Sequence, residues 1–384
     1  MSGVPGPIRV VHMQKFSGIS GSEGHLQQLL TTMDRARVAP SLVMLGGADD
    51  ARERTFRTAL ETAGIPVHRF PILFDIDPAL VGRLVRWFRR ECPTIVHTHL
   101  LHADLHAGLA ARLAGVPVLI STKHNDDRFR QREPVRTIER LLARRTDRVI
   151  TISDALRSFY LRVSSADPSR VTTILYGYAP PGDPAPDAAE ARRAAAVPDG
   201  APLILAVGRL VDQKGHDILL RALPLMARHQ PEPWLIIAGT GNRGRELARL
   251  AEDLGLSGRV RFPGHVDDIR GLMRAATVLA HPARWEGFGL VLLEAMANDL
   301  PIVATAVSAI PEVVASGETG LLVAPDDPVA LAGALDRVLA DGSLRAGLAD
   351  RGRRRLADVF SPVRMAAEHV QVYEAALARA GAAR

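Results

Sequence analysis

The feature that most constrains this chain is an alternation, repeated along its length, of short apolar runs with longer stretches of helical periodicity. Short runs rich in Val, Ile and Leu, separated by helical stretches, are typical of strands buried in a parallel sheet. The runs occupy residues 8–13, 42–45, 67–70, 94–96, 118–121 and 149–151 in the first half of the chain, and residues 203–207, 234–238, 260–262, 278–280 and 302–304 in the second. The pattern predicts an α/β fold with two doubly wound parallel sheets.

The alternation is interrupted once, at residues 178–202, which are rich in Pro, Ala and Asp and have no strand pattern. A chain of 384 residues is also too long for one ordinary hydrophobic core. We therefore predict an N-terminal domain at residues 1–180, a linker at 181–202, a C-terminal domain at 203–360 and a helix at 361–384 that packs back on one of the domains.

Composition excludes several classes of protein. The single cysteine, Cys92, rules out an internal disulfide framework and a cysteine-based metal site. No basic N-terminal region leads into an apolar segment and no apolar run reaches about 18 residues, so we expect a cytoplasmic protein. The formal charge of +6 comes almost entirely from arginine, with only three lysines, which indicates a coding bias. We expect no nucleic-acid partner.

The most informative stretch is HPARWEGFGLVLLEAMANDLP at residues 281–301, which follows one predicted strand and continues as a helix. Glycines on either side of Phe288 let the backbone approach a ligand closely, and the following helix N-terminus offers N–H groups to a phosphate. Glu286 and Glu294 flank this turn, and carboxylates beside a phosphate site accept hydrogen bonds from the hydroxyls of a sugar and a ribose. The structural alternative is a helix N-terminus with two acidic residues and no ligand.

A second motif lies at the end of the predicted strand at residues 203–207. The strand runs into Gly208 and Arg209, and Lys214 follows five positions after the arginine. An arginine fork and a lysine point charge at the carboxyl end of a strand are placed to hold a diphosphate. In the N-terminal domain, a glycine-rich turn that contains Gly21 also predicts a ligand at the carboxyl edge of a sheet.

The order of these motifs resembles that of family 4 retaining glycosyltransferases, which have the GT-B architecture. The resemblance covers most of residues 8–360 and rests on Gly208-Arg209-Leu210…Gln213-Lys214-Gly215, Gly239-Thr240-Gly241 and Glu286-Gly287-Phe288-Gly289-Leu290…Glu294. It implies two Rossmann-like domains that face each other across a cleft, with the nucleotide sugar bound by the C-terminal domain and the acceptor by the N-terminal domain. One departure is Ser20, where the family has glycine before Gly21.

The resemblance also implies roles for individual residues. Arg209 and Lys214 would hold the diphosphate, while Glu286 would contact the donor sugar and Glu294 the ribose hydroxyls. His124 follows a predicted strand and resembles the family's strand-end histidine that points at the donor sugar. The implied catalytic residues are His124, Glu286, Arg209 and Lys214, and the implied donor-binding residues are Gly21, Gly208, Arg209, Lys214, Gly239, Val266, Glu286, Gly287, Phe288, Gly289, Leu290 and Glu294.

The implied activity is that of a hexosyl- or N-acetylhexosaminyltransferase that uses a UDP- or GDP-linked donor and keeps the anomeric configuration. The expected acceptor is a hydroxyl or amine of a lipid-linked, cyclitol or specialised small-molecule compound. Because no carboxylate is placed as a nucleophile, we expect attack on the face from which the phosphate leaves. Charges preorganised around the diphosphate would stabilise the leaving group, so we expect no metal and no cofactor besides the nucleotide-sugar co-substrate.

Two other functions fit part of the sequence. A catalytically silent sugar-nucleotide-binding protein would carry the same donor motifs. A metallohydrolase is indicated by the cluster of His97, His99, His102 and His106, because clustered imidazoles are typical zinc ligands. Leu101, however, stands where the common H-x-H-x-D-H pattern has aspartate.

Two further patterns resemble sites of other enzyme classes. Gly239-x-Gly241-x-x-Gly244 follows a predicted strand like a dinucleotide-binding turn, but the next strand ends without the acidic residue that a dehydrogenase uses. Asp75-x-Asp77 could pass for a metal-binding pair, and we interpret it as a helix-capping cluster.

Basic residues gather at residues 83–90 and 128–148 of the N-terminal domain. A solvated helix in an arginine-rich protein accounts for them, and so does an interfacial helix in contact with anionic lipid. Peripheral contact with the inner face of the membrane therefore stays open as an alternative.

Overall fold

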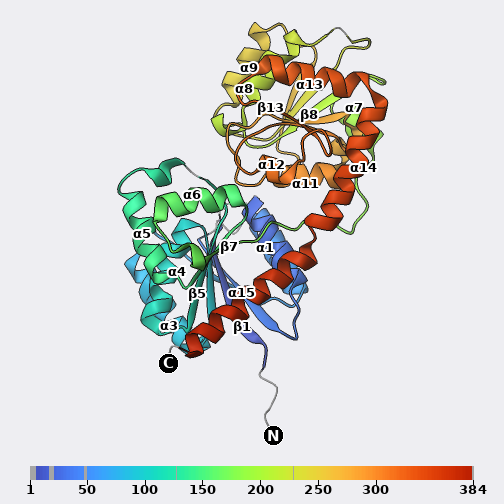
Figure 1. Ribbon diagram of the computed structural model, residues 1–384. Coiled ribbons are helices and arrows are strands. Elements are labelled where there is room, and N and C mark those ends of the chain that lie inside the picture. The colour runs from blue at the N-terminus through green and yellow to red at the C-terminus, as the bar shows by residue number, and fades with distance from the viewer. Residues whose placement is uncertain (1–5, 17–20, 47–49, 127, 228, 383–384) are drawn as a thin grey trace. The chain divides into compact units, whose positions relative to one another are not determined.

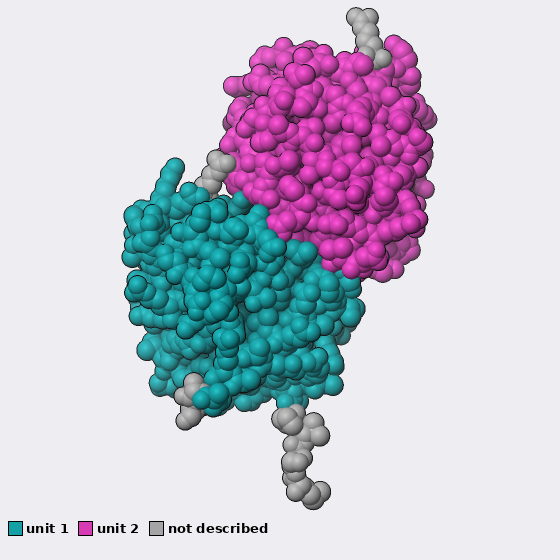
Figure 2. Space-filling view, viewed as in Figure 1, with its two compact units in different colours: residues 1–177, 361–384 teal, residues 178–360 magenta. Residues whose placement is uncertain are grey.

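The computed structural model describes residues 6–16, 21–46, 50–126, 128–227 and 229–382. The chain forms two compact units, which Figure 2 shows in different colours. Unit 1 consists of residues 1–177 and 361–384, and unit 2 consists of residues 178–360. Among the described residues, no helix combines the length and the apolar character that crossing a bilayer requires.

Unit 1 is built on a seven-stranded parallel sheet with the strand order β3-β2-β1-β4-β5-β6-β7 (Figure 1). The strands are β1 (Ile8–Lys15), β2 (Val38–Leu45), β3 (Val67–Phe70), β4 (Ile95–His99), β5 (Val118–Lys123), β6 (Arg148–Thr151) and β7 (Val171–Thr173). The helices are α1 (Gly21–Thr32), α2 (Ala51–Thr62), α3 (Pro78–Glu91), α4 (Leu100–Ala114), α5 (Val135–Arg145), α6 (Asp154–Ser164) and α15 (Pro362–Ala382), with 3-10 helices η1 (Arg128–Gln131) and η2 (Pro168–Arg170). The strand order reverses between β1 and β4, and ligands of doubly wound folds bind at the carboxyl edge of such a point.

Unit 2 is built on a six-stranded parallel sheet with the order β10-β9-β8-β11-β12-β13. The strands are β8 (Leu203–Val207), β9 (Trp234–Ala238), β10 (Val260–Gly264), β11 (Val278–His281), β12 (Ile302–Thr305) and β13 (Leu321–Val323). The helices are α7 (Ala188–Ala194), α8 (His216–Ala222), α9 (Gly244–Asp253), α10 (Arg270–Ala275), α11 (Leu290–Ala297), α12 (Ile310–Val313), α13 (Pro328–Ala340) and α14 (Gly342–Val359), with 3-10 helices η3 (Asp212–Lys214) and η4 (Leu223–Leu225). Here the order reverses between β8 and β11.

The predicted α/β class with two doubly wound parallel sheets is confirmed. Every predicted apolar run is a strand, and β11 and β12 are buried along their whole length, as continuous apolar runs indicate. The two strands that the sequence did not reveal, β7 and β13, lie at sheet edges and have three residues each, too few for a periodic pattern to show.

The segment that we expected to link two domains, residues 181–202, is part of unit 2 in the structure. Its helix α7 packs against α10, where a Cβ at Gly271 would lie 3.1 Å from that of Ala191. Arg270 binds the segment as well, because its guanidinium lies 2.8 Å from the Asp183 carboxylate and donates to the Asp183 carbonyl oxygen at 2.9 Å. The lack of a strand pattern therefore reflects a helix and an ordered loop.

The C-terminal helix α15 packs back, and it does so on unit 1. Figure 1 shows it in red across that unit. Met365, Val370 and Tyr373 are buried in the same apolar cluster as Leu26 and Leu29 of α1. The helix thus closes one face of the unit 1 sheet.

Candidate active site

The carboxyl ends of β8 and β9 approach so closely that two glycines are required. Gly208 has φ 155° and Gly239 has φ 144°, and a Cβ on Gly239 would lie 2.0 Å from the Gly208 carbonyl oxygen. The Gly208 N–H donates to the Ala238 carbonyl at 2.9 Å, which keeps the two backbones together. A Cβ on Gly241 would likewise lie 2.3 Å from the Leu210 carbonyl oxygen, so this third glycine also lets the loops pack as they do.

Lys214 ends the short helix η3 after this turn, and its ammonium forms an ion pair with the Glu286 carboxylate. The same carboxylate oxygen lies 3.1 Å from Nε2 of His281, the last residue of β11. Burial alone would raise the pKa of Glu286, but the Lys214 ammonium and His281 outweigh burial and hold that pKa well below its usual range. Glu286 is therefore ionised and already paired in the free protein.

Arg209 is exposed at the end of β8, and its side chain is oriented by a neighbour. Its guanidinium donates to the Gln213 side-chain oxygen at 3.2 Å, and Gln213 donates in turn to the Trp285 carbonyl at 3.1 Å. Gln213 thus joins the arginine to the loop before Glu286. A guanidinium has five N–H groups, so Arg209 keeps donors for a ligand.

The turn at residues 286–289 leads into α11. Gly289 has φ 86°, stands at the N-cap and provides no side chain to cap the helix. Phe288 is 2% exposed and packs edge-on against Phe360, with 5.9 Å between ring centroids. Leu290 is the first residue of α11, so the backbone from Gly287 to Leu290 ends at an uncapped helix N-terminus, which favours a bound anion.

Glu294 differs from Glu286 in having no partner. Among the residues that the structure describes, none forms a hydrogen bond or an ion pair with its carboxylate, and its backbone carbonyl alone accepts, from the Asn298 amide at 2.8 Å. Burial raises the pKa of Glu294 to about 7. An acceptor group that is partly buried, desolvated and unpaired is suited to hydroxyl donors.

All the predicted donor-binding residues except Gly21 belong to unit 2. Val266 lies in the loop after β10. The last residue of β10, Gly264, accepts a hydrogen bond at 2.7 Å through its carbonyl from the N–H of Gly239, which follows β9. Gly21 begins α1 in unit 1, at the carboxyl end of β1. Ser20, the predicted departure from the family pattern, lies outside the described residues.

His124 follows β5 in unit 1, and both of its ring nitrogens have partners. Nε2 lies 2.9 Å from Nδ1 of His99, and Nδ1 lies 2.5 Å from the Tyr176 hydroxyl. Burial lowers the pKa of His124 to about 3, so the ring is neutral. To contact a donor sugar through a hydrogen bond, as the sequence predicts, His124 would have to exchange one of these partners.

These contacts continue through the interior of unit 1. His99 Nε2 lies 3.0 Å from Nδ1 of His12, and His12 Nε2 lies 3.4 Å from the Tyr373 hydroxyl. That hydroxyl lies 2.8 Å from Nδ1 of His97, whose Nε2 lies 2.7 Å from the Thr122 hydroxyl. The result is one continuous chain of neutral hydrogen-bonding groups.

The four histidines of the metallohydrolase alternative do not converge. His102 contacts Lys15 and Asp75, and His106 Nε2 accepts from the Asp77 N–H at 3.0 Å. Within the described part of the chain, the group with metal-ligand spacing is instead His12, His97 and His99, whose ligand atoms lie within 4.8 Å of one another. Each of their ring nitrogens already lies within hydrogen-bonding distance of a protein group, as described above.

A buried ion network beside His124 was not predicted. The Lys123 ammonium lies 2.6 Å from the Asp104 carboxylate and 3.4 Å from that of Glu139, and Arg130 also pairs with Glu139. Burial alone would lower the pKa of Lys123, but Asp104 and Glu139 outweigh it and raise that pKa. The network ties α4, α5 and η1 to the end of β5, which fixes the backbone that carries His124.

Sequence reasoning assigned no role to Gln213, which it named within a motif, or to His281 in unit 2, and it did not single out His12, Tyr176 and Tyr373 in unit 1. His281 is the first residue of the 281–301 stretch and follows an apolar run. A polar residue at the end of a buried strand lies at the edge of the sheet where ligands bind, so the sequence did point to His281. His12 and His97 are neighbours in register on β1 and β4, which no local pattern shows.

The chain matches known families over both of its units. Residues 187–355 match the family described as Glycosyl transferases group 1, and residues 19–179 match the family described as Glycosyltransferase Family 4. The uncharacterized glycosyltransferase MJ1607 of Methanocaldococcus jannaschii is 36% identical over 193 residues, which are 50% of this chain and 49% of that protein. The chain thus spans about half the length of this relative.

A second relative is aligned over more of its length. The D-inositol 3-phosphate glycosyltransferase of Salinispora arenicola is 33% identical over 315 residues, covering 75% of this chain and 70% of that protein. The solved structure of Anabaena Alr3699/HepE in complex with UDP and glucose superposes with a TM-score of 0.82 at 22% identity, covering 96% of this chain and 100% of the other, which shows a shared fold. The chain therefore belongs to the glycosyl transferases group 1 family, and its fold is that of the GT-B glycosyltransferases.

Proposed function

We propose that this protein transfers a sugar from a UDP- or GDP-linked donor to a hydroxyl or amine, with the anomeric configuration kept. The observation that carries the proposal is the contrast at the carboxyl edge of unit 2 between two glutamates. Glu286 is ionised and paired with Lys214, whereas Glu294 is partly buried and has no hydrogen-bond or ion-pair partner among the described residues. A nucleotide sugar offers an anion for the cation and hydroxyls for the carboxylates.

The leaving group explains the placement of the positive charges. Departure of the nucleoside diphosphate breaks the bond between the anomeric carbon and the phosphate oxygen, and negative charge develops on that oxygen. Lys214, Arg209 and the N-terminus of α11 would stabilise this charge as preorganised groups. When the diphosphate binds, the Lys214 ammonium would shift toward it, which frees the Glu286 carboxylate for a sugar hydroxyl.

Retention follows if the acceptor attacks from the face that the phosphate leaves. The acceptor oxygen or nitrogen forms the new bond to the anomeric carbon, and its proton passes to the departing phosphate oxygen. Glu286 is a poor nucleophile here, because Lys214 and His281 hold its carboxylate and lower its basicity. Since the protein's own cations face the diphosphate, we propose that the reaction needs neither a metal nor a further cofactor.

The acceptor is proposed to be a lipid-linked, cyclitol or specialised small-molecule hydroxyl or amine. The name of one relative, D-inositol 3-phosphate glycosyltransferase, supports the cyclitol class. The structure of a GT-B neighbour with UDP and glucose supports a nucleotide-sugar donor. Unit 1 would present the acceptor at the carboxyl edge of its sheet.

The test is a panel of UDP-, GDP- and ADP-sugars in a thermal-shift assay, followed by detection of released nucleoside diphosphate with candidate acceptors. We expect one donor to stabilise the protein and to be consumed with and without EDTA, and NMR of the product to show the donor's anomeric configuration. Binding without turnover for every acceptor would favour the silent sugar-nucleotide-binding protein. Stabilisation by no donor would contradict the proposal.

A further inference from the structure

The loop between β3 and α3, residues 71–77, exposes large apolar side chains. Leu73 is 70% exposed, Phe74 69% and Ile76 77%. Single apolar residues on a surface are ordinary, but three within four positions, interrupted by the exposed Asp75, form an unusual apolar projection. We refer to residues 71–77 as the apolar loop.

The apolar loop is held in shape by Asp77, whose polar groups face the protein, while the side chain of Asp75 is 86% exposed. Asp77 is 3% exposed, and its carboxylate accepts from the Leu80 N–H at 2.9 Å and the Leu73 N–H at 3.3 Å. The Asp77 N–H donates to His106. The predicted capping role is therefore confirmed for Asp77, while Asp75 lies 3.4 Å from the Lys15 ammonium. The usual surface pattern is inverted, because an aspartate is buried while its apolar neighbours are exposed.

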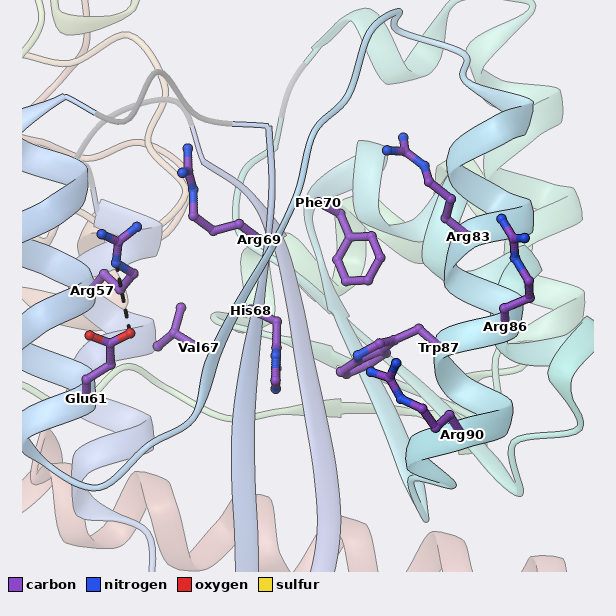
Figure 3. Close-up of a pocket in the computed structure, with 10 residues that line it drawn as sticks. All are labelled: Arg57, Glu61, Val67, His68, Arg69, Phe70, Arg83, Arg86, Trp87 and Arg90. Atoms are coloured by element: carbon purple, nitrogen blue, oxygen red, sulfur yellow. Dashed lines mark ion pairs between the residues drawn. The ribbon is translucent and has the colours of Figure 1, made fainter.

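An arginine-lined basin lies next to the loop. It has a volume of about 970 Å³; β3, the edge strand of the sheet, forms its floor, and α2 and α3 form its walls (Figure 3). We refer to it as the arginine basin. Its lining residues are Arg57, Glu61, Val67, His68, Arg69, Phe70, Arg83, Arg86, Trp87 and Arg90.

The charges of the basin are only partly compensated. Within the described ranges, Glu61 is the one carboxylate that lines the basin, and it lies 3.9 Å from Arg57. Arg69 pairs with Glu53 beneath the surface, and Arg90 pairs with Glu91. Arg86 is exposed and forms no ion pair or hydrogen bond with any described residue. The basin therefore keeps guanidinium donors for an anionic partner.

Arg83 joins the basin to the apolar loop. Its guanidinium donates to the Pro71 carbonyl at 2.8 Å and lies 3.5 Å from the Asp77 carboxylate. The apolar loop precedes α3, and Arg83, Arg86 and Arg90 follow along that helix, so a surface that extends from the loop along α3 also meets the arginines. Apolar side chains beside arginines match the boundary of an anionic bilayer, where acyl chains lie beneath phosphates.

We propose that the apolar loop and the arginine basin dock unit 1 on an anionic lipid surface. Leu73, Phe74 and Ile76 enter the acyl boundary, and Arg86 and Arg90 bind lipid phosphates. The inference deepens the proposed function and rests on it, because it assigns the acceptor to the lipid-linked class. The loop follows the carboxyl end of β3, and Asp75 contacts Lys15 at the carboxyl end of the parallel strand β1. Docking there brings a lipid-linked acceptor to the edge where unit 1 binds ligands.

The test is flotation of the full chain with vesicles of phosphatidylcholine, with or without phosphatidylglycerol. We expect flotation only with phosphatidylglycerol, and release when salt rises from about 0.1 M to about 1 M, which shortens the Debye length from about 10 Å to about 3 Å. The Arg86→Gln, Arg90→Gln double variant should bind roughly 25-fold more weakly, since each arginine near an anionic surface contributes about 1 kcal/mol, or about fivefold. The Leu73→Ser, Phe74→Ser, Ile76→Ser triple variant should bind these vesicles at least about tenfold more weakly than the wild type.

Matched controls come from exposed residues elsewhere. Val329→Ser with Val363→Ser removes side chains that are 67% and 69% exposed, and Arg353→Gln with Arg354→Gln removes two exposed arginines of α14. Both controls should float like the wild type. Equal flotation on neutral vesicles, no flotation on either, or unchanged binding by the two loop and basin variants would overturn the proposal. So would a change from oligomer to monomer in the triple variant, because a second copy would then be the partner.

Donor turnover separates this proposal from the function on which it rests. Release of nucleoside diphosphate from the donor without vesicles should be the same in the wild type and in the loop and basin variants. If the wild type floats and no donor is consumed or bound, the proposed function fails and lipid docking stands. If donor is consumed and flotation is absent, lipid docking fails alone.

Discussion

Lys214 and Glu286 form an ion pair that is largely buried in unit 2, and His281 lies 3.1 Å from the same carboxylate oxygen. The two residues are 72 positions apart and meet because β8 and β11 are neighbours in the sheet. In the free protein, the lysine that we propose to bind the diphosphate is thus paired with the carboxylate that we propose to bind the sugar. A bound donor would replace one partner of each residue.

We expect Lys214→Ala to lower kcat/KM for the donor by about 10²- to 10³-fold, the usual cost of removing one group that stabilises developing charge. Release of nucleoside diphosphate measures the loss. The pKa of Glu286 lies well below its usual range. The ionised carboxylate therefore stabilises the folded protein fully above the ordinary carboxyl pKa of 4.5, and this contribution is lost only as pH falls through the lower folded pKa. The wild-type kcat/KM should therefore gain no pH dependence from Glu286 between about pH 6 and pH 8. Full activity would contradict the site, and Arg353→Ala on α14 is the control.

Glu294→Gln should weaken donor binding and yet stabilise the free protein at neutral and alkaline pH. The folded pKa of Glu294 is about 7, above its ordinary value of 4.5, so the folded state binds the proton more tightly and this group lowers stability as pH rises between those two values. A pKa rise of this size lowers the free energy of unfolding by about 3 kcal/mol at most. Urea unfolding at pH 5 and pH 8 should show the variant's gain at pH 8 alone. Equal gains at both pH values would show that burial of the charge is not the cause.

Unit 1 should be more sensitive to acid than unit 2. Burial lowers the pKa of His12 and His124 to about 3 and holds those of His97 and His99 well below the ordinary 6.5. The unfolded chain therefore binds more protons below about pH 6.5, and each such histidine removes about 1.4 kcal/mol of stability per pH unit down to its folded pKa. Hydrogen exchange at pH 7.5 and pH 5.5 should show a larger loss of protection in unit 1. Equal losses would contradict a neutral histidine chain.

Tyr373→Phe should destabilise unit 1, because the hydroxyl lies between His97 and His12. Loss of a partner for a buried polar group costs about 1–3 kcal/mol. Chemical unfolding of the variant measures this cost, and Tyr178→Phe in unit 2 is the comparison. A stability equal to that of the wild type would show that the hydroxyl is not needed by the imidazoles.

Gly239→Ala should abolish donor binding and destabilise unit 2, since the new Cβ would lie 2.0 Å from the Gly208 carbonyl oxygen at a φ of 144°. The matched control is Gly333→Ala in α13, where a Cβ meets nothing within 4 Å. That control should be neutral or stabilising by about 0.5–1 kcal/mol. Thermal unfolding with and without donor measures both variants. A Gly239→Ala protein that binds donor normally would show that the β8 and β9 loops can move apart.

The sequence by itself determined the two doubly wound sheets, because parallel strands buried on both faces leave continuous apolar runs that helical stretches separate. It also determined which residues come after β8 and β11, since Gly208 directly follows the first of these runs, and Lys214 and Glu286 lie between a run and the next α-helix. A strand of three residues, such as β7, leaves no pattern and was missed.

Tertiary structure alone decided the state of each charged or polar group. Glu286 and Glu294 carry the same side chain and are both desolvated, and only packing gives one a lysine and leaves the other without a partner among the described residues. His124 resembles a free strand-end histidine in the sequence, whereas His99 and Tyr176 occupy both of its nitrogens in the fold. The physical reason is that pKa and hydrogen-bond availability depend on neighbours brought together from distant parts of the chain. Apolar periodicity, by contrast, depends only on residues that are close together in the sequence.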